Sequence, residues 1–288
     1  MIPIYVLICT IEDGILRVPG VMCRPTEGVH YVVSWQQSAG LEAYGNLSVP
    51  DGSIAAETAL LSRPDVTLTT LAGRGLCRNR NHAIHTALSL MPDPLTDAIM
   101  VIADDDERLD ADAFSRLRTT YGKFPKADII LMRMRNDTNG SYFKHYPPTY
   151  TLYGRRPRYY YPSSWEMTFR SRICHTGLLF DERFGLGAEF LCAGEEEVFM
   201  HDAVRRGLCA IIAPVDLGST SPATTGSKVL DPKVLRSKGG VYGYRFSLIV
   251  AWLRALHEAL SIGLRYRRNP LRLFRHILDG INYIRKVA

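Results

Sequence analysis

The segment IMVIADDDERLD, residues 99–110, decides how this chain of 288 residues folds. Its apolar run, Ile99–Ala103, leads directly into Asp104, Asp105 and Asp106. A short apolar run of this kind predicts a strand covered on both faces, as the strands of parallel sheets are. In such sheets ligands bind beyond the carboxyl ends of the strands, where the three acids stand. The segment therefore predicts a buried strand and a binding site directly after it.

Similar apolar runs recur along the first half of the chain and alternate with helical patterns. We expect strands at Ile4–Thr10, Tyr31–Ser34, Val66–Leu71, Ile99–Ala103 and Ile129–Met134, and helices at Asn79–Leu90 and Ala111–Tyr121. Alternation of strand and helix predicts an α/β fold with a mainly parallel, Rossmann-like sheet and helices on both faces.

The last part of the chain predicts a helical appendage. Apolar residues recur there at spacings of three and four: Phe246, Ile249, Leu253, Leu256, Leu260 and Leu264. Asn269 and Pro270 then predict the start of a second helix, with Asn as its cap and Pro at its first position. We expect a main domain over residues 1–244 and a basic amphipathic tail over 245–288.

The charge of +6 is placed unevenly. Residues 245–288 contain nine basic and two acidic residues, a net charge of +7, which leaves −1 for the other 244 residues. A slightly acidic main body argues against nucleic-acid binding. For the tail, two interpretations stay open. Its apolar stripe packs on the main domain, or the tail contacts the anionic inner face of the cell membrane as a peripheral anchor.

The location expected from the sequence is the cytoplasm. The six cysteines include no CxxC pair, which indicates reduced thiols. No run of 18 apolar residues predicts a transmembrane helix, and the first residues lack the features of a signal peptide.

The acidic run after Ile99–Ala103 predicts a metal site. Adjacent carboxylates repel one another, so a positive partner is expected. On an extended chain, alternate residues such as Asp104 and Asp106 face the same side. Their oxygen atoms suit Mg²⁺ or Mn²⁺, which commonly binds one or two carboxylates together with substrate phosphates. The alternative is a solvated turn, which the position after a buried strand disfavours.

A second acidic run, GEEEVFMHDAVRRG at residues 194–207, predicts a turn that enters an amphipathic helix. Carboxylates near a helix N-terminus are favourable in themselves because of the helix dipole. Alternatively, one of Glu195, Glu196 and Glu197 is a general base that takes the proton from an attacking hydroxyl.

Three segments in order, GRGLCRNRNHAI (73–84), ADDDERLD (103–110) and GEEEVFMHDAVRRG, resemble motifs of the family 2 glycosyltransferases, which have the GT-A fold. That family commonly shows a G-L-S-x-x-R-N-like helix entry, an Asp-x-Asp metal motif after a strand, and a Gly-Glu-Asp or Gly-Glu-Glu helix start. The resemblance spans about Ile4 to Gly240. It implies a bacterial-type, metal-dependent, inverting glycosyltransferase.

The resemblance also implies roles for individual residues. Asp104 and Asp106 would bind Mn²⁺ or Mg²⁺ on the diphosphate of a nucleotide sugar, with a UDP-sugar the expected donor, and Asp105 would contact its ribose or sugar. Other residues expected around the donor are Thr10, Glu12, Ser34, Gln36, Gly75, Arg80 and Asn81. Residues 1–135 would form the donor-binding half and 136–244 the acceptor-side half.

Glu196 stands where the family's base, an Asp, is found, and Glu195 is its neighbour. Because Glu moves the carboxylate by one methylene, the base stays open among Glu195–Glu197. One base and direct displacement imply inversion at the sugar's anomeric carbon. The expected acceptor is a hydroxyl of a glycan or a lipid-linked molecule, as in cell-surface polysaccharide synthesis.

Weaker patterns leave further questions open. The segments Ser219–Gly226 and Ser237–Gly240 predict loops, the second with Lys238 as a phosphate contact. The aromatic segment Tyr142–Trp165 either stacks on sugar rings or packs under loops. A sugar nucleotidyltransferase is disfavoured because ICTIEDGILRV (8–18) lacks a glycine-rich phosphate loop and a lysine. A non-catalytic nucleotide-sugar-binding protein of the same fold is disfavoured by the intact acids.

Overall fold

The structure is a computed structural model that describes residues 1–37, 52–93, 96–221 and 229–287. The chain divides into two compact units. Unit 1 comprises Met1–Arg74, Arg78–Leu179 and Asp202–Pro222, and unit 2 comprises Gly75–Cys77, Phe180–His201 and Ala223–Ala288. The predicted domain boundaries after residues 135 and 244 stay predictions, because compactness does not show which parts fold independently.

Unit 1 is built on a mixed sheet to which the described residues contribute nine strands, in the order β3-β2-β1-β4-β8-β6-β9-β5, with β7 paired to β9. The strands are β1 Ile4–Ile11, β2 Val29–Gln37, β3 Val66–Ala72, β4 Ile99–Asp104, β5 Arg108–Leu109, β6 Ile129–Asn136, β7 Thr151–Leu152, β8 Met167–Arg170 and β9 Ala210–Thr220. The long pairs β1–β2, β2–β3, β1–β4 and β6–β9 are parallel. The pairs that involve the short strands are antiparallel. All five predicted strands are confirmed, each longer than expected at one or both ends.

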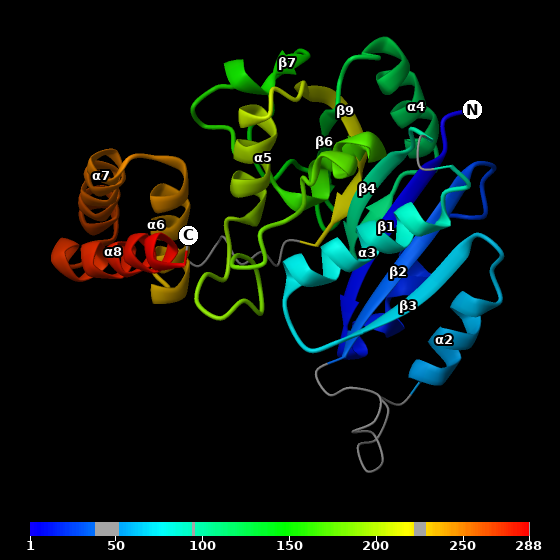
Figure 1. Cartoon of the computed structure of the whole chain (residues 1–288), viewed down its shortest axis with the longest axis horizontal. Coiled ribbons are helices and arrows are strands. Elements are labelled where there is room, and N and C mark those ends of the chain that lie inside the picture. The colour runs from blue at the N-terminus through cyan, green and yellow to red at the C-terminus, as the bar shows by residue number, and fades with distance from the viewer. Residues whose placement is uncertain (38–51, 94–95, 222–228, 288) are drawn as a thin grey trace. The chain divides into compact units, whose positions relative to one another are not determined.

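Helices cover both faces of this sheet, as predicted. Ala103 of β4 lies in the core cluster formed with α4 (Ala113–Lys123). The next residue, Asp104, points to the other face, because side chains alternate along a strand. There it meets Arg80 of α3 (Leu76–Leu90), the helix that crosses the parallel strands in Figure 1. The shorter helices of unit 1 are η1 Glu12–Leu16, α1 Val18–Val21, α2 Ser53–Leu61, η3 Tyr153–Arg155, η4 Ser164–Glu166 and η5 Ser171–Thr176.

Unit 2 is helical. It contains α6 (Pro232–Arg245), α7 (Leu248–Tyr266), α8 (Pro270–Lys286) and the first two turns of α5 (Glu195–Arg205). The predicted start of the last helix is confirmed. The Asn269 side chain accepts a hydrogen bond of 2.9 Å from the backbone N–H of Leu271, with Pro at the first helical position.

Glycines allow α6 and α8 to pack backbone against backbone. A Cβ atom added at Gly239 would lie 1.8 Å from the Ile277 carbonyl oxygen, and one at Gly280 would lie 1.8 Å from the Arg236 carbonyl oxygen. Neither position has room for any side chain. The predicted loop at Ser237–Gly240 is therefore wrong: these residues lie within α6, and their glycines serve helix packing.

The second predicted loop, Ser219–Gly226, is wrong at its start, because Ser219 and Thr220 complete β9. Residues 222–226 of that segment lie outside the described residues. Across the residues that the structure describes, no helix combines the length and apolar character needed to cross a bilayer.

Candidate functional site

The carboxyl ends of three parallel strands meet at one edge of the sheet in unit 1. Cys9 of β1 is level with Ser34 of β2 on one side and with Asp104 of β4 on the other. The predicted donor residues of these strands therefore gather at one edge, as the topology requires. The first turns of α3 reach the same edge, where the Asn79 side chain donates a hydrogen bond of 3.0 Å to the carbonyl oxygen of Thr10.

Asp105 connects β1 and the segment that follows it to the end of β4. The Thr10 hydroxyl donates a hydrogen bond of 2.5 Å to Asp105 Oδ2, and Arg17 donates to Oδ1 from Nη2 at 2.6 Å and from Nε at 3.1 Å. A Cβ atom at Gly14 would lie 2.1 Å from Asp105 Oδ2, so the close approach of the carboxylate needs a glycine there. Asp105 thus holds the turn after β1 against the acidic loop, which is the segment Asp104–Glu107 at the end of β4. Its predicted contact with the donor stays a prediction.

Asp104 faces the opposite side and meets Arg80. Arg80 Nη2 lies 3.4 Å from Asp104 Oδ1, and the Arg80 side chain is only 1% exposed. Burial raises the pKa of Asp104, and the charges of Asp106 and Asp105 raise it further, whereas Arg80 lowers it. Asp106 thus lies within electrostatic reach of Asp104, although residues 105 and 106 form a turn and not the extended chain assumed from the sequence.

Glu107 is a candidate site residue that the sequence analysis missed. It is 4% exposed, and within the described residues neither of its carboxylate oxygens has a hydrogen-bond partner. Burial, followed by the charges of Asp104 and Asp106, raises the pKa of Glu107 well above its usual range. Burying a carboxyl group without a hydrogen-bond partner costs free energy, so a cation or a hydrogen-bond donor bound beside Glu107 would stabilise the protein.

The acids present fit a divalent cation only as part of a larger ligand set. In the described part of the chain, no three His, Cys, Asp or Glu side chains gather as a metal-binding group. Two carboxylates are nevertheless the usual protein share of a Mg²⁺ site completed by substrate phosphates. Asp104 and Asp106 fit that share, and Glu107 is buried within electrostatic reach of both.

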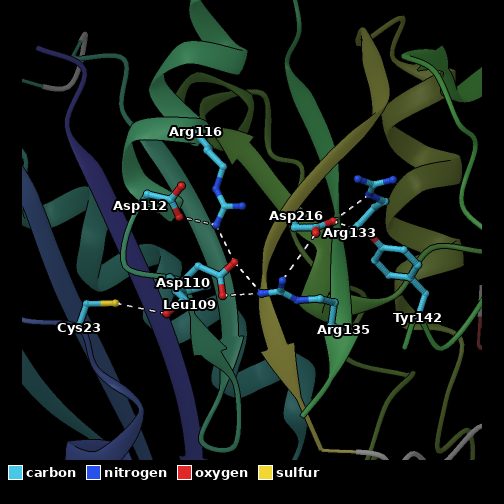
Figure 2. Close-up of polar contacts among 9 residues, drawn as sticks. All are labelled: Cys23, Leu109, Asp110, Asp112, Arg116, Arg133, Arg135, Tyr142 and Asp216. Carbon is cyan, nitrogen blue, oxygen red and sulfur yellow. Dashed lines mark hydrogen bonds and ion pairs between the residues drawn. The ribbon is translucent and has the colours of Figure 1, made fainter. Parts of the chain in front are cut away.

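An ion-pair network fixes the chain that follows the acidic loop and β5, as Figure 2 shows. Asp110, just after β5, accepts bonds from Arg135 of β6 at 2.6 and 2.7 Å and from Arg116 of α4 at 2.6 Å. Arg133 pairs in the same way with Asp216 of β9 at 2.9 Å. The acidic loop is therefore anchored on both sides, by β4 before it and by this network after it.

Two buried polar groups of β2 point to a ligand. Ser34 and Gln36 are 0% and 2% exposed, and within the described chain Ser34 Oγ and Gln36 Nε2 have no hydrogen-bond partner. Leaving a buried polar group unsatisfied costs about 1–3 kcal/mol, which a bound ligand would recover. Nearby, the carbonyl oxygen of Glu12 accepts a hydrogen bond of 2.9 Å from the Trp35 indole. Asn81, another predicted donor residue, is buried.

The remaining predicted residues lie in unit 2. Glu195 is buried and Glu196 is partly exposed, at the start of α5. Glu197 forms an ion pair with Arg245 of α6. Lys238, the predicted phosphate contact, forms an ion pair with Glu258 of α7.

Gly75 also belongs to unit 2. It adopts a φ of +124°, which favours glycine, immediately before α3 begins. It therefore shapes the turn that leads into the helix carrying Asn79 and Arg80.

The sequence matches no protein-family model and no curated protein. Solved structures do match. S. aureus TarS 1–349 gives a TM-score of 0.60 at 11% identity, over 100% of this chain and 92% of that chain. A second S. aureus TarS structure gives 0.57 at 12% identity, over 99% of this chain and 55% of that chain.

The mannosyltransferase PcManGT from Pyrobaculum calidifontis, in complex with GDP-Man and Mn²⁺, gives a TM-score of 0.49 at 13% identity, over 100% of this chain and 76% of that chain. At the identities of the two TarS structures, the likeness shows a shared fold. The predicted fold class, an α/β sheet with helices on both faces and C-terminal helices, is confirmed.

Proposed function

We propose that this chain is an inverting glycosyltransferase that moves a sugar from a nucleotide diphosphate sugar to a hydroxyl of a glycan or lipid-linked acceptor, as in cell-surface polysaccharide synthesis. The observation that carries the proposal is the acidic loop Asp104–Glu107, anchored at the edge where β1, β2 and β4 end. Its local excess of negative charge suits a cation that binds a diphosphate.

Asp104 and Asp106 are the proposed ligands of Mn²⁺ or Mg²⁺. When bound, the cation would neutralise the charge that develops on the departing nucleoside diphosphate. Arg80 holds Asp104 from the side of α3, and Asp105 fixes the neighbouring turn through Thr10 and Arg17. These contacts keep the acidic loop in place before the nucleotide sugar binds, so its carboxylates lose less conformational freedom on binding.

The donor, proposed as a UDP-sugar, would place its base and ribose along Thr10, Glu12, Ser34 and Gln36. The buried hydroxyl of Ser34 and the buried amide of Gln36 supply hydrogen-bonding capacity that the described chain leaves unused. Asp105, Gly75, Arg80 and Asn81 complete the proposed donor-binding set. A phosphate contact from Lys238 would require its ion pair with Glu258 to open.

Glu196, or its neighbour Glu195, is the proposed general base for the acceptor hydroxyl. Glu197 is the weaker candidate, because its carboxylate is already engaged in an ion pair with Arg245. Direct displacement assisted by one base inverts the configuration of the transferred sugar. The proposed location is the cytoplasm, since the six cysteines form no disulfide among the described residues.

A donor screen tests this proposal. A ligand that binds only the native state raises the free energy of unfolding, by about 2.7 kcal/mol at 100 times its Kd, and therefore raises the melting temperature. We expect one or more UDP-sugars to stabilise the protein in the presence of Mn²⁺ or Mg²⁺, and Asp106→Ala to abolish that shift. Asp137→Ala, which removes an exposed aspartate on the loop after β6, is the matched control and should keep it.

Assays of the released products separate the alternatives. Release of pyrophosphate from a nucleoside triphosphate and a sugar phosphate would identify a nucleotidyltransferase and contradict the proposal. Donor binding without nucleotide release in the presence of any acceptor or water would indicate a non-catalytic binding protein of the same fold.

A further inference from the structure

The apolar stripe of α7 lies on the surface of the protein. Ile249, Leu253, Leu256, Leu260 and Leu264 follow one another at spacings of three and four, which places them on one side of the helix. They are 74%, 62%, 44%, 46% and 81% exposed. Soluble proteins rarely leave a row of large apolar side chains in water, so this face is built to be covered.

α7 packs within unit 2 through its opposite side. Ala251, Ala255 and Ala259 are fully buried and share a core cluster with Ile277 and Ile281 of α8. The small alanines let α7 lie close to its neighbours, and Ile262 joins them in the core, while the leucines of the stripe and Ile249 take no part in it. α8 differs, since Leu273, Ile277, Ile281 and Ile284 are buried and only Leu271, at its start, is a strongly exposed large apolar residue. The apolar stripe of α7 is therefore left uncovered within the described residues.

Exposed basic and amphipathic side chains accompany this stripe in α7, in the turn after it and in α8. Trp252 and Tyr266 are 45% and 39% exposed, and Leu271 at the start of α8 is 70% exposed. The exposed arginines of α7, of α8 and of the turn between them are Arg254, Arg265, Arg267, Arg268, Arg272 and Arg275. Only two acidic residues accompany them in residues 245–288, and one of these, Glu258, is paired with Lys238.

We propose that α7 is a membrane-docking helix that lies in the surface of an anionic lipid bilayer. Its leucine stripe would enter the boundary between head groups and acyl chains, and its arginines would meet lipid phosphates. Trp252 and Tyr266 suit this depth, because their rings are apolar and their N–H and O–H groups need polar partners. This inference does not depend on the transferase proposal, since it uses no residue of the donor site.

A second copy of the chain is the competing occupant of the stripe. Pairing two α7 helices along their leucines would bring the arginine-rich border of one copy beside that of the other. Like charges at an interface are unfavourable, whereas an anionic lipid surface neutralises them. The charge pattern therefore favours lipid.

Vesicle flotation of the full chain tests the proposal. We expect binding to vesicles that contain phosphatidylglycerol and at least tenfold weaker binding to vesicles of phosphatidylcholine alone. Raising the ionic strength from about 0.1 M to about 1 M should also weaken binding, because the screening length falls to about 3 Å. The emission of Trp252 should shift to shorter wavelength on binding. Equal recovery with and without vesicles would overturn the proposal.

Variants identify the surface responsible. Leu253→Glu with Leu264→Glu should reduce vesicle binding at least tenfold, and both positions are exposed enough to keep the fold intact. The matched control is Ile54→Glu with Leu61→Glu on α2, two helix positions that are 70% and 62% exposed. The control adds the same charge and should bind vesicles like the original chain. Equal losses in both double variants would overturn the assignment to α7.

Sedimentation without lipid decides the occupant. We expect a monomer whose mass the α7 variant leaves unchanged. A dimer that dissociates in Leu253→Glu with Leu264→Glu, but not in the α2 control, would assign the stripe to a second copy and overturn the proposal. Donor-dependent melting shifts should be the same in both double variants, so failure of membrane binding and failure of the proposed transferase activity give different results.

Discussion

Lys144 and Glu166 form a buried ion pair in unit 1, in the segment whose tyrosines the sequence left undecided. Their side chains are 4% and 0% exposed, and the Tyr160 hydroxyl also donates to Glu166. Lys144 Nζ lies 4.7 Å from the centre of the Tyr160 ring and 4.3 Å from that of Tyr161. Some of these aromatics therefore pack around a buried charge, while Tyr161 is also 48% exposed.

Removing Lys144 should destabilise the protein in a pH-dependent way. Burial raises the pKa of Glu166 and Lys144 opposes that rise, so Lys144→Met leaves a carboxyl group whose ionisation disfavours the fold. We expect a loss of about 3–5 kcal/mol near neutral pH. Because the folded-state pKa is raised, the loss should shrink as the pH falls toward the ordinary glutamate pKa, where the unfolded chain binds the proton as well.

Urea titrations at several pH values measure this loss. Adding Glu166→Gln to Lys144→Met should recover most of the stability and remove its pH dependence, since no unpaired charge then remains. Lys126→Met, at an exposed lysine, should change stability by less than about 0.5 kcal/mol. A Lys144→Met variant as stable as the original chain at neutral pH would contradict the buried pair.

Glu107 permits a second test at this scale. Because the pKa of Glu107 is raised by burial and by the charges of Asp104 and Asp106, folding at neutral pH must take up a proton or bury a charge there, so Glu107→Gln should stabilise the metal-free protein by about 1–3 kcal/mol. The gain from adding Mn²⁺ should become smaller, since less negative charge then surrounds the cation. Melting temperatures with a chelator and with Mn²⁺ measure both effects, and Glu189→Gln at an exposed position is the control. Destabilisation of the chelated variant would refute this account of Glu107.

The position of the candidate site was predictable from the sequence where its residues are neighbours in the chain. Asp104–Asp106 follow the apolar run of β4 directly, so the sequence placed these acids at the end of a buried strand, and their role stays a prediction. Arg17 lies 88 positions from Asp105, and nothing in its local sequence signals their pairing. Glu107 was missed for a different reason, because its burial depends on how the chain turns after β4.

At the scale of elements, the packing of α6 against α8 depends on glycine. Gly239→Ala or Gly280→Ala would place a methyl group 1.8 Å from a backbone oxygen of the other helix. Overpacking of this kind typically costs about 1–3 kcal/mol, and the backbone contact makes relief difficult here. Gly122→Ala in α4 is the matched control, since its added Cβ meets nothing within 4 Å.

Thermal or urea denaturation separates these variants. Gly122→Ala should stabilise the protein by about 0.5–1 kcal/mol, because alanine is the better helix former. The α6 and α8 variants should unfold at lower temperature or lower urea concentration than the original chain. Equal stability of Gly239→Ala and Gly122→Ala would show that the two helices do not pack as closely as described.

These glycines also show where sequence patterns mislead about elements. Asn269 and Pro270 predict the start of α8 correctly, because helix capping depends on local hydrogen bonds. Gly239 and Gly240 suggested a loop, because glycine weakens an isolated helix. In the folded protein Gly239 is required by the backbone of Ile277 in α8, and Gly240 leaves room for the Leu191 side chain. Local propensity is overruled wherever packing needs the absence of a side chain.

At the scale of the whole molecule, most residues proposed to bind the donor and the residues proposed as the general base belong to different units. The donor-binding set is mostly in unit 1, whereas the proposed bases, Glu195 and Glu196, belong to unit 2. Variants in the two sets should therefore fail in different ways. Asp106→Ala should lose donor binding, and with it every later step. A variant that lacks the base should still bind the donor.

Glu196→Gln and Glu195→Gln test this division and settle which residue is the base. Removing a general base typically lowers the rate of the chemical step by about 10²–10⁴-fold. We expect that loss in kcat for one of the two variants, with the donor Kd from melting shifts or calorimetry unchanged within about twofold. Glu182→Gln, at an exposed glutamate of the same unit, is the control. If both variants transfer sugar at the original rate, neither residue is the base; if the slow variant has also lost donor affinity, its carboxylate serves the donor and the assignment of chemistry to α5 fails.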